Sequence, residues 1–282
     1  MSKRNLRGSR AIITGASSGI GWELALEFAR RGASVCVMAR REERLAELVA
    51  ELNAIREASF PESPEHFYVA GDVCSADDRE RTLTETESRF GGIDVLVNNA
   101  GAGATLAIEE TSDELACEMF DLNFLSPFEL TKGALPALKA SAESAENRRA
   151  GIRPFVVNVS SIVGVRGTPY FGVYGASKAA LLTLTDAWRV ELAGTGVEFL
   201  TVTPGTTSSE FFDKLREDRL RPNLPKHRAA TPKEGALAIA NAVEKGKKRL
   251  VPASKSAALL SVIARFCPGF TDGVMARFVV KE

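Results

Sequence analysis

Short apolar runs rich in β-branched residues alternate along this chain with longer segments that mix apolar and polar residues. The short runs predict strands buried on both faces, and the longer segments predict helices with one polar face. Strands are expected near residues 10–14, 34–39, 66–71, 93–98, 154–160, 197–203 and 249–252. Helices are expected near residues 19–31, 41–58, 75–90, 112–139, 173–194 and 232–246. This alternation predicts an α/β fold, a doubly wound parallel sheet of about seven strands flanked by helices in a single domain.

Two segments depart from this regular pattern. Residues 140–153 are small, polar and charged, and we expect them to extend the fifth helix or its loop as a solvated surface insertion. Residues 255–282 form an apolar C-terminal extension, in which the run 257–266 and the run 274–280 are separated by Cys267-Pro268-Gly269. Neither run is long enough to span a bilayer, so two short helices are expected there.

A glycine-rich turn follows the first predicted strand. Residues 11–14 lead into Gly15-Ala16-Ser17-Ser18-Gly19-Ile20-Gly21, and an amphipathic helix follows. A turn of this kind lets the backbone approach a pyrophosphate, and the helix N-terminus offers free N–H groups and a positive dipole end. The spacing of the first two glycines is wider than in the common dinucleotide fingerprint, so the context of strand, turn and helix carries the prediction.

Tyr174 and Lys178 lie four residues apart in a predicted helix, and therefore on one face of it. A phenol normally loses its proton near pH 10, and an ammonium one turn away lowers that pKa toward a usable general acid/base. A core tyrosine beside a solvated lysine is the alternative. Upstream, a predicted strand ends in Ser160 and Ser161, at the edge of the sheet where α/β proteins bind ligands, although such serines can also cap the next segment.

Several motifs, in a fixed order, resemble the classical short-chain dehydrogenase/reductase family from about Arg10 to Pro252. Residues 14–21 resemble its cofactor motif, Asp72-Val73 its adenosine-side motif, Asn98-Asn99-Ala100-Gly101 its sheet-stabilising motif, and Pro204-Gly205 its nicotinamide turn. Asn123, Ser161, Tyr174 and Lys178 resemble its catalytic tetrad in order and spacing. The resemblance implies one Rossmann-like NAD(P)-binding domain over residues 1–254, which includes the catalytic site and a substrate lid at about 205–230.

The resemblance also implies a role for each residue. Tyr174 is the general acid/base for hydride transfer between a carbonyl and an alcohol, Lys178 lowers its pKa and binds the nicotinamide ribose, Ser161 polarises the substrate oxygen, and Asn123 holds a water. Ser160 is a neighbour without that role. The implied cofactor-binding residues are Gly15, Ser17, Ser18, Gly19, Ile20, Gly21, Arg40, Arg41, Asp72, Val73, Asn99, Ala100, Gly101, Tyr174, Lys178, Pro204, Gly205 and Thr207.

The end of the second strand indicates which cofactor is used. An NAD enzyme needs an acidic acceptor there for the ribose 2′-hydroxyl, whereas a 2′-phosphate needs cationic donors. Ala39 stands where NAD-preferring relatives carry aspartate, and Arg40 follows with a guanidinium suited to phosphate. The alternative is that Arg40 and Arg41 merely begin the next helix, and Ser18 stands where many NADP-preferring members carry a second basic residue. We expect NADP(H) rather than NAD(H).

The segment after Pro204-Gly205 is expected to cover the substrate. Phe211, Phe212 and Leu215 form an apolar helical stripe among charged residues, which is typical of ordinary packing or of the inner face of a lid. Together with Ser161 and Tyr174, these residues are the candidate substrate contacts. They favour an apolar carbonyl or alcohol as the substrate.

Composition and charge narrow the class of protein further. The formal net charge is +0, so no global field draws the chain to nucleic acid. The chain has 4 cysteines without metal-ligand spacing and 2 histidines without neighbouring partners, so no metal site is expected. Reduced thiols and a polar, basic N-terminus without the apolar run of a signal peptide predict a cytoplasmic protein.

The apolar tail bears on possible partners. It can pack over the substrate pocket or a subunit interface, make a peripheral contact with a membrane, or remain a loose end. We expect a homodimer or homotetramer that buries residues 255–280. For the chain as a whole, an active oxidoreductase competes with a non-catalytic nucleotide-binding sensor or scaffold, and the intact tetrad favours the enzyme.

Overall fold

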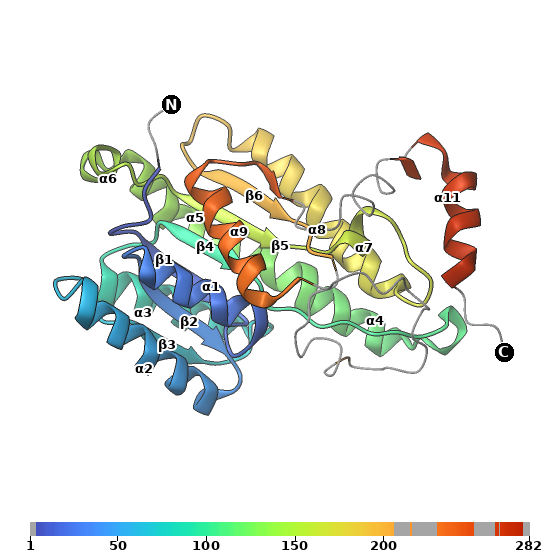
Figure 1. The fold of residues 1–282 in the computed structure, drawn as a ribbon, viewed down its shortest axis with the longest axis horizontal. Coiled ribbons are helices and arrows are strands. Elements are labelled where there is room, and N and C mark those ends of the chain that lie inside the picture. The colour runs from blue at the N-terminus through green and yellow to red at the C-terminus, as the bar shows by residue number, and fades with distance from the viewer. Residues whose placement is uncertain (1–3, 206–214, 216–229, 251–262, 265, 279–282) are drawn as a thin grey trace.

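The computed structural model describes residues 4–205, 215, 230–250, 263, 264 and 266–278. Its centre is a seven-stranded sheet in the order β3-β2-β1-β4-β5-β6-β7, and every neighbouring pair is parallel (Figure 1). The strands are β1 Arg10–Thr14, β2 Ser34–Ala39, β3 Phe67–Ala70, β4 Val95–Asn98, β5 Phe155–Val159, β6 Glu198–Val202 and β7 Arg249–Leu250. The predicted fold class is confirmed.

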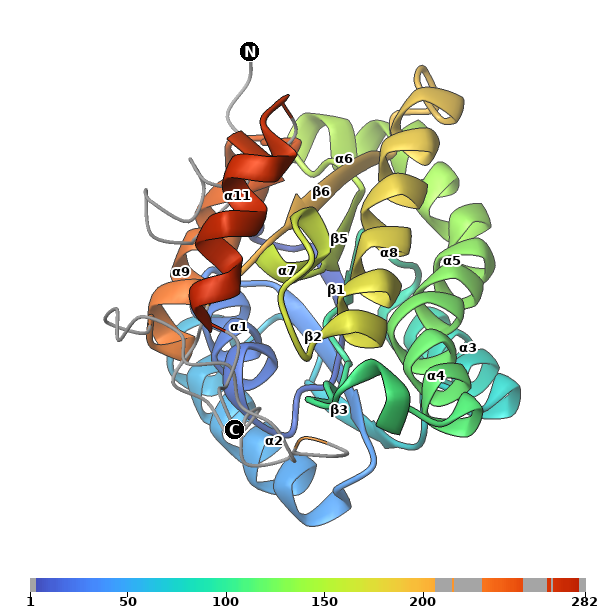
Figure 2. The ribbon, with the colours of Figure 1, turned by 90° about the vertical axis from the view of Figure 1, so that its right-hand side faces the viewer.

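Helices cover both faces of this sheet. The described helices are α1 Gly19–Arg30, α2 Glu42–Ser59, α3 Ala76–Phe90, α4 Asp113–Phe120, α5 Ser126–Glu143, α6 Ala145–Ala150, α7 Ile162–Val165, α8 Gly172–Glu191, α9 Pro232–Glu244 and α11 Pro268–Met275, with the single-turn helices η1 Ile108–Glu110 and η4 Ala276–Phe278 and the π-helix η2 Asp121–Leu125. Figure 2 shows α1, α2 and α9 on one side of the sheet and α3, α5 and α8 on the other.

The core is divided by the sheet into two layers, because successive strand residues point to opposite faces. Within β1, Ile13 packs in the layer that also holds Phe28 of α1, whereas Ile12 packs in the layer that holds Trp188 of α8. Strands buried on both faces therefore appear as continuous apolar runs, which is why their positions are predictable from the sequence.

The chain order creates a switch point in the sheet. From β1 the chain winds outward through β2 and β3, then returns to β4 on the other side of β1. The connections after β1 and β4 therefore leave the sheet in opposite directions, and a crevice opens at their carboxyl ends. In Figure 1 the arrowheads point toward the side of the molecule where α4, α7 and α11 lie.

The single helix expected over 112–139 is three consecutive helical segments, α4, η2 and α5. The π-helix between them inserts an extra residue into the helical turn, and apolar periodicity alone does not reveal such an insertion. The short helix α7 was not predicted either, since four residues are too few for a periodic pattern.

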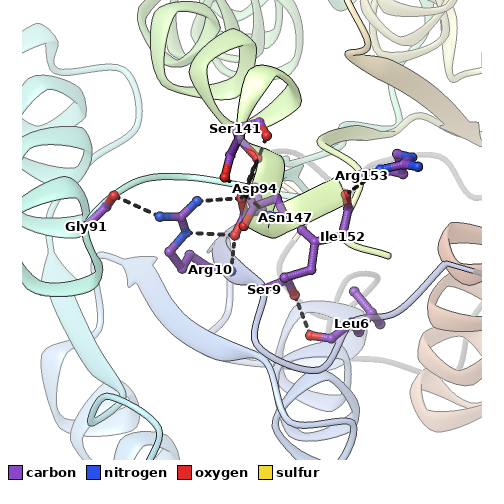
Figure 3. Close-up of polar contacts among 10 residues, drawn as sticks. Leu6, Ser9, Arg10, Gly91, Asp94, Ser141, Asn147, Ile152 and Arg153 are labelled. Carbon is purple, nitrogen blue, oxygen red and sulfur yellow. Dashed lines mark hydrogen bonds and ion pairs between the residues drawn. The ribbon is translucent and has the colours of Figure 1, made fainter. Parts of the chain in front are cut away.

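The prediction of a solvated insertion at residues 140–153 was wrong in part. Ser141 and Asn147 are buried, and their side chains donate hydrogen bonds to Asp94 Oδ1, from Asn147 at 3.0 Å (Figure 3). Arg10 completes this cluster with a forked pair of hydrogen bonds of 2.7 Å to the two Asp94 oxygens. Because a buried carboxylate needs such partners, the insertion serves to satisfy Asp94.

In the tail, the position of the second helix differs from the prediction. α11 begins at Pro268, inside the expected break, because proline suits the first position of a helix, where its missing N–H is not needed. Most of the run 257–266 lies outside the described residues. No helix in the described part of the chain is long and apolar enough to cross a membrane.

His66, beside β3, makes stability depend on pH. Its Nδ1 accepts a hydrogen bond of 2.9 Å from the Val35 backbone, and burial together with the charge of Arg56 lowers its pKa to about 4. The unfolded chain binds this proton near pH 6.5, so the contribution is complete above that pH and is lost as pH falls toward 4. From His66 we expect a loss of about 2 kcal/mol in the free energy of unfolding, measured by urea titration from pH 7 to pH 4.5.

The control for this prediction is His66→Gln, which offers a hydrogen-bond acceptor but does not titrate. It is expected to be less stable at pH 7 and to lose less stability on acidification than the parent. Equal losses in the two proteins over this range would mean that His66 does not carry the effect.

Candidate active site

The motif residues gather at the carboxyl edge of the sheet. The glycine-rich turn follows β1, the segment 99–101 follows β4, Ser160 and Ser161 follow β5, and Pro204 and Gly205 follow β6. Since these strands are adjacent and parallel, their ends lie side by side on the face seen in Figure 2. The Ile162 backbone N–H donates to the Pro204 carbonyl at 3.0 Å and joins the last two connections.

The turn after β1 packs against the segment after β4. Asn99 Nδ2 donates to the Thr14 carbonyl at 2.9 Å, and Thr14 Oγ1 accepts from the backbone N–H groups of Asn99 and Ala100. A Cβ on Gly15 would lie 2.7 Å from Ala100 Cα, and a Cβ on Gly21 would lie 2.5 Å from Asn99 Nδ2. Both glycines are therefore required by close packing of the two segments.

The N-terminus of α1 has no side-chain cap among the described residues. Ser18 is its N-cap residue but makes no capping hydrogen bond, and Gly15 and Gly19 adopt left-handed φ values of +67° and +62°. The first N–H groups of the helix are therefore left to a ligand or water, which is the arrangement that favours an anion.

The two arginines after β2 have different surroundings. Arg41 lies on the glycine-rich turn, with its guanidinium donating to Ser17 Oγ at 2.9 Å and Ser18 Oγ at 2.8 Å. The Arg40 side chain is 63% exposed and lies 4.0 Å from the Asp72 carboxylate, so it is held only loosely. Val73, the residue after Asp72, is buried. The sequence favours Arg40 as the main partner of a 2′-phosphate, whereas in the structure Arg41 is the arginine in direct contact with the turn.

The structure separates the two serines after β5. Ser160 is buried, and its hydroxyl donates to the Lys178 backbone carbonyl at 2.8 Å. Ser161 is the N-cap residue of α7 and forms a side-chain hydrogen bond with Tyr174. Ser161 is therefore the serine beside the phenol, and Ser160 joins α8 to the strand.

Tyr174 and Lys178 are both buried in α8, with exposed fractions of 7% and 4%. The expected lowering of the Tyr174 pKa is not found: burial raises it to about 12, and the hydrogen bond with Ser161 acts in the opposite direction. Burial also lowers the pKa of Lys178 to about 8, and its ammonium donates to the Val159 carbonyl at 3.0 Å. The sequence could not reveal this, because it does not show how deeply the lysine lies.

Asn123 lies in the π-helix η2 and is fully buried. Its side chain exchanges hydrogen bonds with the Ala102 backbone, with Oδ1 accepting at 3.2 Å and Nδ2 donating at 3.0 Å. A Cβ on Gly101 would lie 2.8 Å from Asn123 Oδ1 and 3.0 Å from Lys178 Nζ. The bare backbone of Gly101 thus lets the amide and the ammonium approach one point.

Ser177 links the candidate residues, although the sequence did not identify it as a site residue. Its hydroxyl accepts from Asn123 Nδ2 at 3.1 Å and donates to the Tyr174 carbonyl at 2.9 Å. Its place between the tyrosine and the lysine was the available signal, because a residue three positions after Tyr174 shares a helix face with it. Ser177 therefore holds Asn123 against α8.

The candidate substrate contacts after Gly205 are not placed. Thr207, Phe211 and Phe212 lie outside the described residues, and Leu215 is partly buried. The predicted lid therefore stays a prediction. Among the described residues, no group of histidine, cysteine and carboxylate side chains could hold a metal ion.

The parallel sheet, with a glycine-rich turn at its switch point, defines a protein of the Rossmann class. The family model described as short chain dehydrogenase matches residues 9–220. The chain belongs to this family of oxidoreductases.

Curated and solved relatives agree with this assignment. The chain is 39% identical to an uncharacterized oxidoreductase of Thermotoga maritima over 73% of this chain and 74% of the relative. It is 40% identical to 11-beta-hydroxysteroid dehydrogenase 1A of Arabidopsis thaliana over 73% of this chain, but the match covers only 54% of that protein.

Two solved structures show the same fold. An alcohol dehydrogenase from the archaeon Thermococcus sibiricus, complexed with 5-hydroxy-NADP, has a TM-score of 0.71 and 30% identity over 86% of this chain and 95% of that chain. A 3-ketoacyl-(acyl-carrier-protein) reductase from Brucella melitensis, complexed with NADH, has a TM-score of 0.76 and 25% identity over 90% of this chain and 100% of that chain.

Proposed function

We propose that this protein is an NADP(H)-dependent oxidoreductase that interconverts a carbonyl and a secondary alcohol on an apolar small molecule. The observation that carries the proposal is the placement of Ser161, Tyr174 and Lys178 together at the carboxyl edge of the sheet, beside the glycine-rich turn. The segment after β4 meets this group at Gly101, which lies against the side chains of Asn123 and Lys178.

The residues at the switch point fit a dinucleotide. The uncapped N-terminus of α1 suits the pyrophosphate, and Gly15 and Gly21 let the turn that leads into it pack closely on the segment after β4. Asp72 and Val73 follow β3, where the adenosine is expected, and Pro204 and Gly205 follow β6, where the nicotinamide is expected. When bound, this cofactor would supply or accept the hydride.

The chain's own residues handle the proton. Tyr174 is protonated at neutral pH because burial raises its pKa to about 12, so in the reducing direction it donates its proton to the substrate oxygen. Ser161 holds that oxygen through its hydroxyl. The buried ammonium of Lys178 stabilises the phenolate that remains, and Asn123 supports the water that returns a proton.

Arg40 favours NADP(H). The preceding residue is Ala39, so position 39 has no carboxylate that could accept a hydrogen bond from a ribose 2′-hydroxyl. The Arg40 guanidinium is exposed, and its ion pair with Asp72 is at the limit of contact. Arg41, held by Ser17 and Ser18, adds positive charge where many NADP-preferring relatives carry a basic residue in the turn itself. Both arginines support a 2′-phosphate site.

The experiment that tests the function is a scan of the purified protein with NADPH and NADH against ketones, quinones, aldehydes and secondary alcohols. Turnover of a ketone or alcohol is the expected result. Cofactor binding without turnover of any compound would favour a non-catalytic sensor or scaffold instead.

We further propose that the apolar tail is buried between subunits of a homodimer or homotetramer. Phe266, just before α11, and Phe270, within it, are 77% and 63% exposed, and proteins in water rarely leave such residues together on a free surface. An ion pair between Arg166 and Asp272 fixes α11 to the segment after α7, so this apolar face is held in a defined place.

Deletion of everything after Pro252 is therefore expected to lower the mass in solution from oligomer to smaller species, as measured by light scattering. Phe266→Ser combined with Phe270→Ser should act in the same direction without shortening the chain. Ile108→Ser is the control, because Ile108 is 79% exposed and lies in η1, away from the tail in sequence. An unchanged mass in both tail variants would contradict the proposal, and flotation with liposomes would favour a membrane contact.

A further inference from the structure

The connection between α7 and α8 holds a tyrosine in a backbone conformation that suits glycine. Tyr170 has a φ of +67°, and it is the one non-glycine residue with positive φ in the described ranges. The Phe171 N–H donates to the Thr168 carbonyl at 3.1 Å, so residues 168–171 form a four-residue turn with Pro169 second and Tyr170 third. This is the pattern of a type II turn, whose third residue is normally glycine or asparagine.

The turn itself does not require a side chain at this position. A Cβ makes the left-handed conformation costly, whereas glycine adopts it freely. Surrounding contacts hold Tyr170 in place: the Leu106 N–H donates to its carbonyl at 3.0 Å, and the Gly175 N–H donates to the Phe171 carbonyl at 2.7 Å. Strained residues that persist in this way gather at functional sites.

The position of the turn shows which function a side chain there can serve. The turn joins the helix that follows Ser161 to the helix that carries Tyr174, and its bond to Leu106 ties it to the connection after β4. Phe171 is buried, with its ring centroid 6.0 Å from that of Tyr174, so it provides the packing. Tyr170 is only partly buried, in the connection between α7 and α8.

We propose that Tyr170 is a specificity-determining residue, whose ring forms a wall of the substrate entrance and contacts ring-sized apolar ketones but not short ones. This inference rests on the proposed function, since it concerns the same site. A tyrosine supplies a large, rigid contact area there, which glycine would lack.

The test compares Tyr170→Gly and Tyr170→Phe with the parent, using NADPH and two probes, 1-decalone and butan-2-one. Tyr170→Gly is expected to raise Tm by about 2 °C, because it removes the backbone strain. For 1-decalone its KM is expected to rise about tenfold with kcat nearly unchanged, while kcat/KM for butan-2-one stays the same. Tyr170→Phe retains the ring and should keep the parent's preference.

A role in folding alone would change both probes by the same factor, and that result, or no change in either, would overturn the inference. If the parent reduces neither ketone, binding of the two probes to the NADPH complex by equilibrium dialysis decides the inference, whereas the proposed function is decided by the full scan of carbonyls and alcohols. Loss of 1-decalone binding in Tyr170→Gly alone would uphold it. Equal binding in the three proteins, or no binding of 1-decalone to the parent, would overturn it.

Discussion

Tyr174→Phe is expected to bind NADPH as the parent does and to lose turnover by about a thousandfold. The substitution keeps the buried ring and its contact with Phe171, and removes only the hydroxyl that forms the hydrogen bond with Ser161. The proton donor is thus lost without a cavity. The measurement is kcat with the best substrate of the scan, together with the dissociation constant of NADPH from fluorescence.

Tyr68→Phe is the matched control for this prediction. Tyr68 lies in β3, and its hydroxyl contacts Glu42 at 3.2 Å, on a different part of the molecule. This variant should keep the activity of the parent. If Tyr174→Phe retained activity within about tenfold of the parent, the assignment of Tyr174 as proton donor would be wrong.

Arg40→Asp is expected to reverse the order of cofactor affinity. In the parent, NADPH should bind more tightly than NADH by about 10- to 150-fold, the range for a hydrogen bond to a charged group. The aspartate repels the 2′-phosphate and offers an acceptor to the ribose 2′-hydroxyl. Dissociation constants for both cofactors, measured for both proteins by fluorescence titration at one ionic strength, check the prediction.

Arg44→Asp controls for the change in charge. Arg44 lies in α2, and its guanidinium is 4.5 Å from the centre of the Trp22 ring, so the same change in net charge occurs nearby but outside the proposed phosphate site. It should leave the ratio of the two affinities unchanged. Equal affinities of the parent for NADPH and NADH would contradict the role given to Arg40.

The regular part of this fold could be predicted because local pattern and final environment agree. Each strand is an apolar run because it is buried on both faces, and the glycine-rich turn is recognisable because strand, turn and helix are contiguous in the chain. The order of the candidate site residues was predictable for the same reason. The glycine-rich turn, the segment 99–101 and Ser161 each follow a strand, and parallel strands end at one edge.

What could not be predicted depends on contacts between distant segments. The π-helix around Asn123 adds one residue to a helical turn, which the periodicity of a long helix conceals. The depth of Lys178, and with it the direction of the pKa shifts, follows from packing of α7 on α8. The left-handed backbone of Tyr170 is set by its bond to Leu106, far away in the sequence.

The cluster around Asp94 lies at the opposite end of the strands from the candidate site, since Arg10 begins β1 and Asp94 directly precedes β4. One edge of the sheet therefore anchors the scaffold, and the opposite edge carries the chemistry. A library that varies the substrate edge leaves this anchor intact, so active-site redesign can proceed without compensating mutations there. At the anchor edge, removal of Arg10 would leave the buried Asp94 carboxylate without its cation.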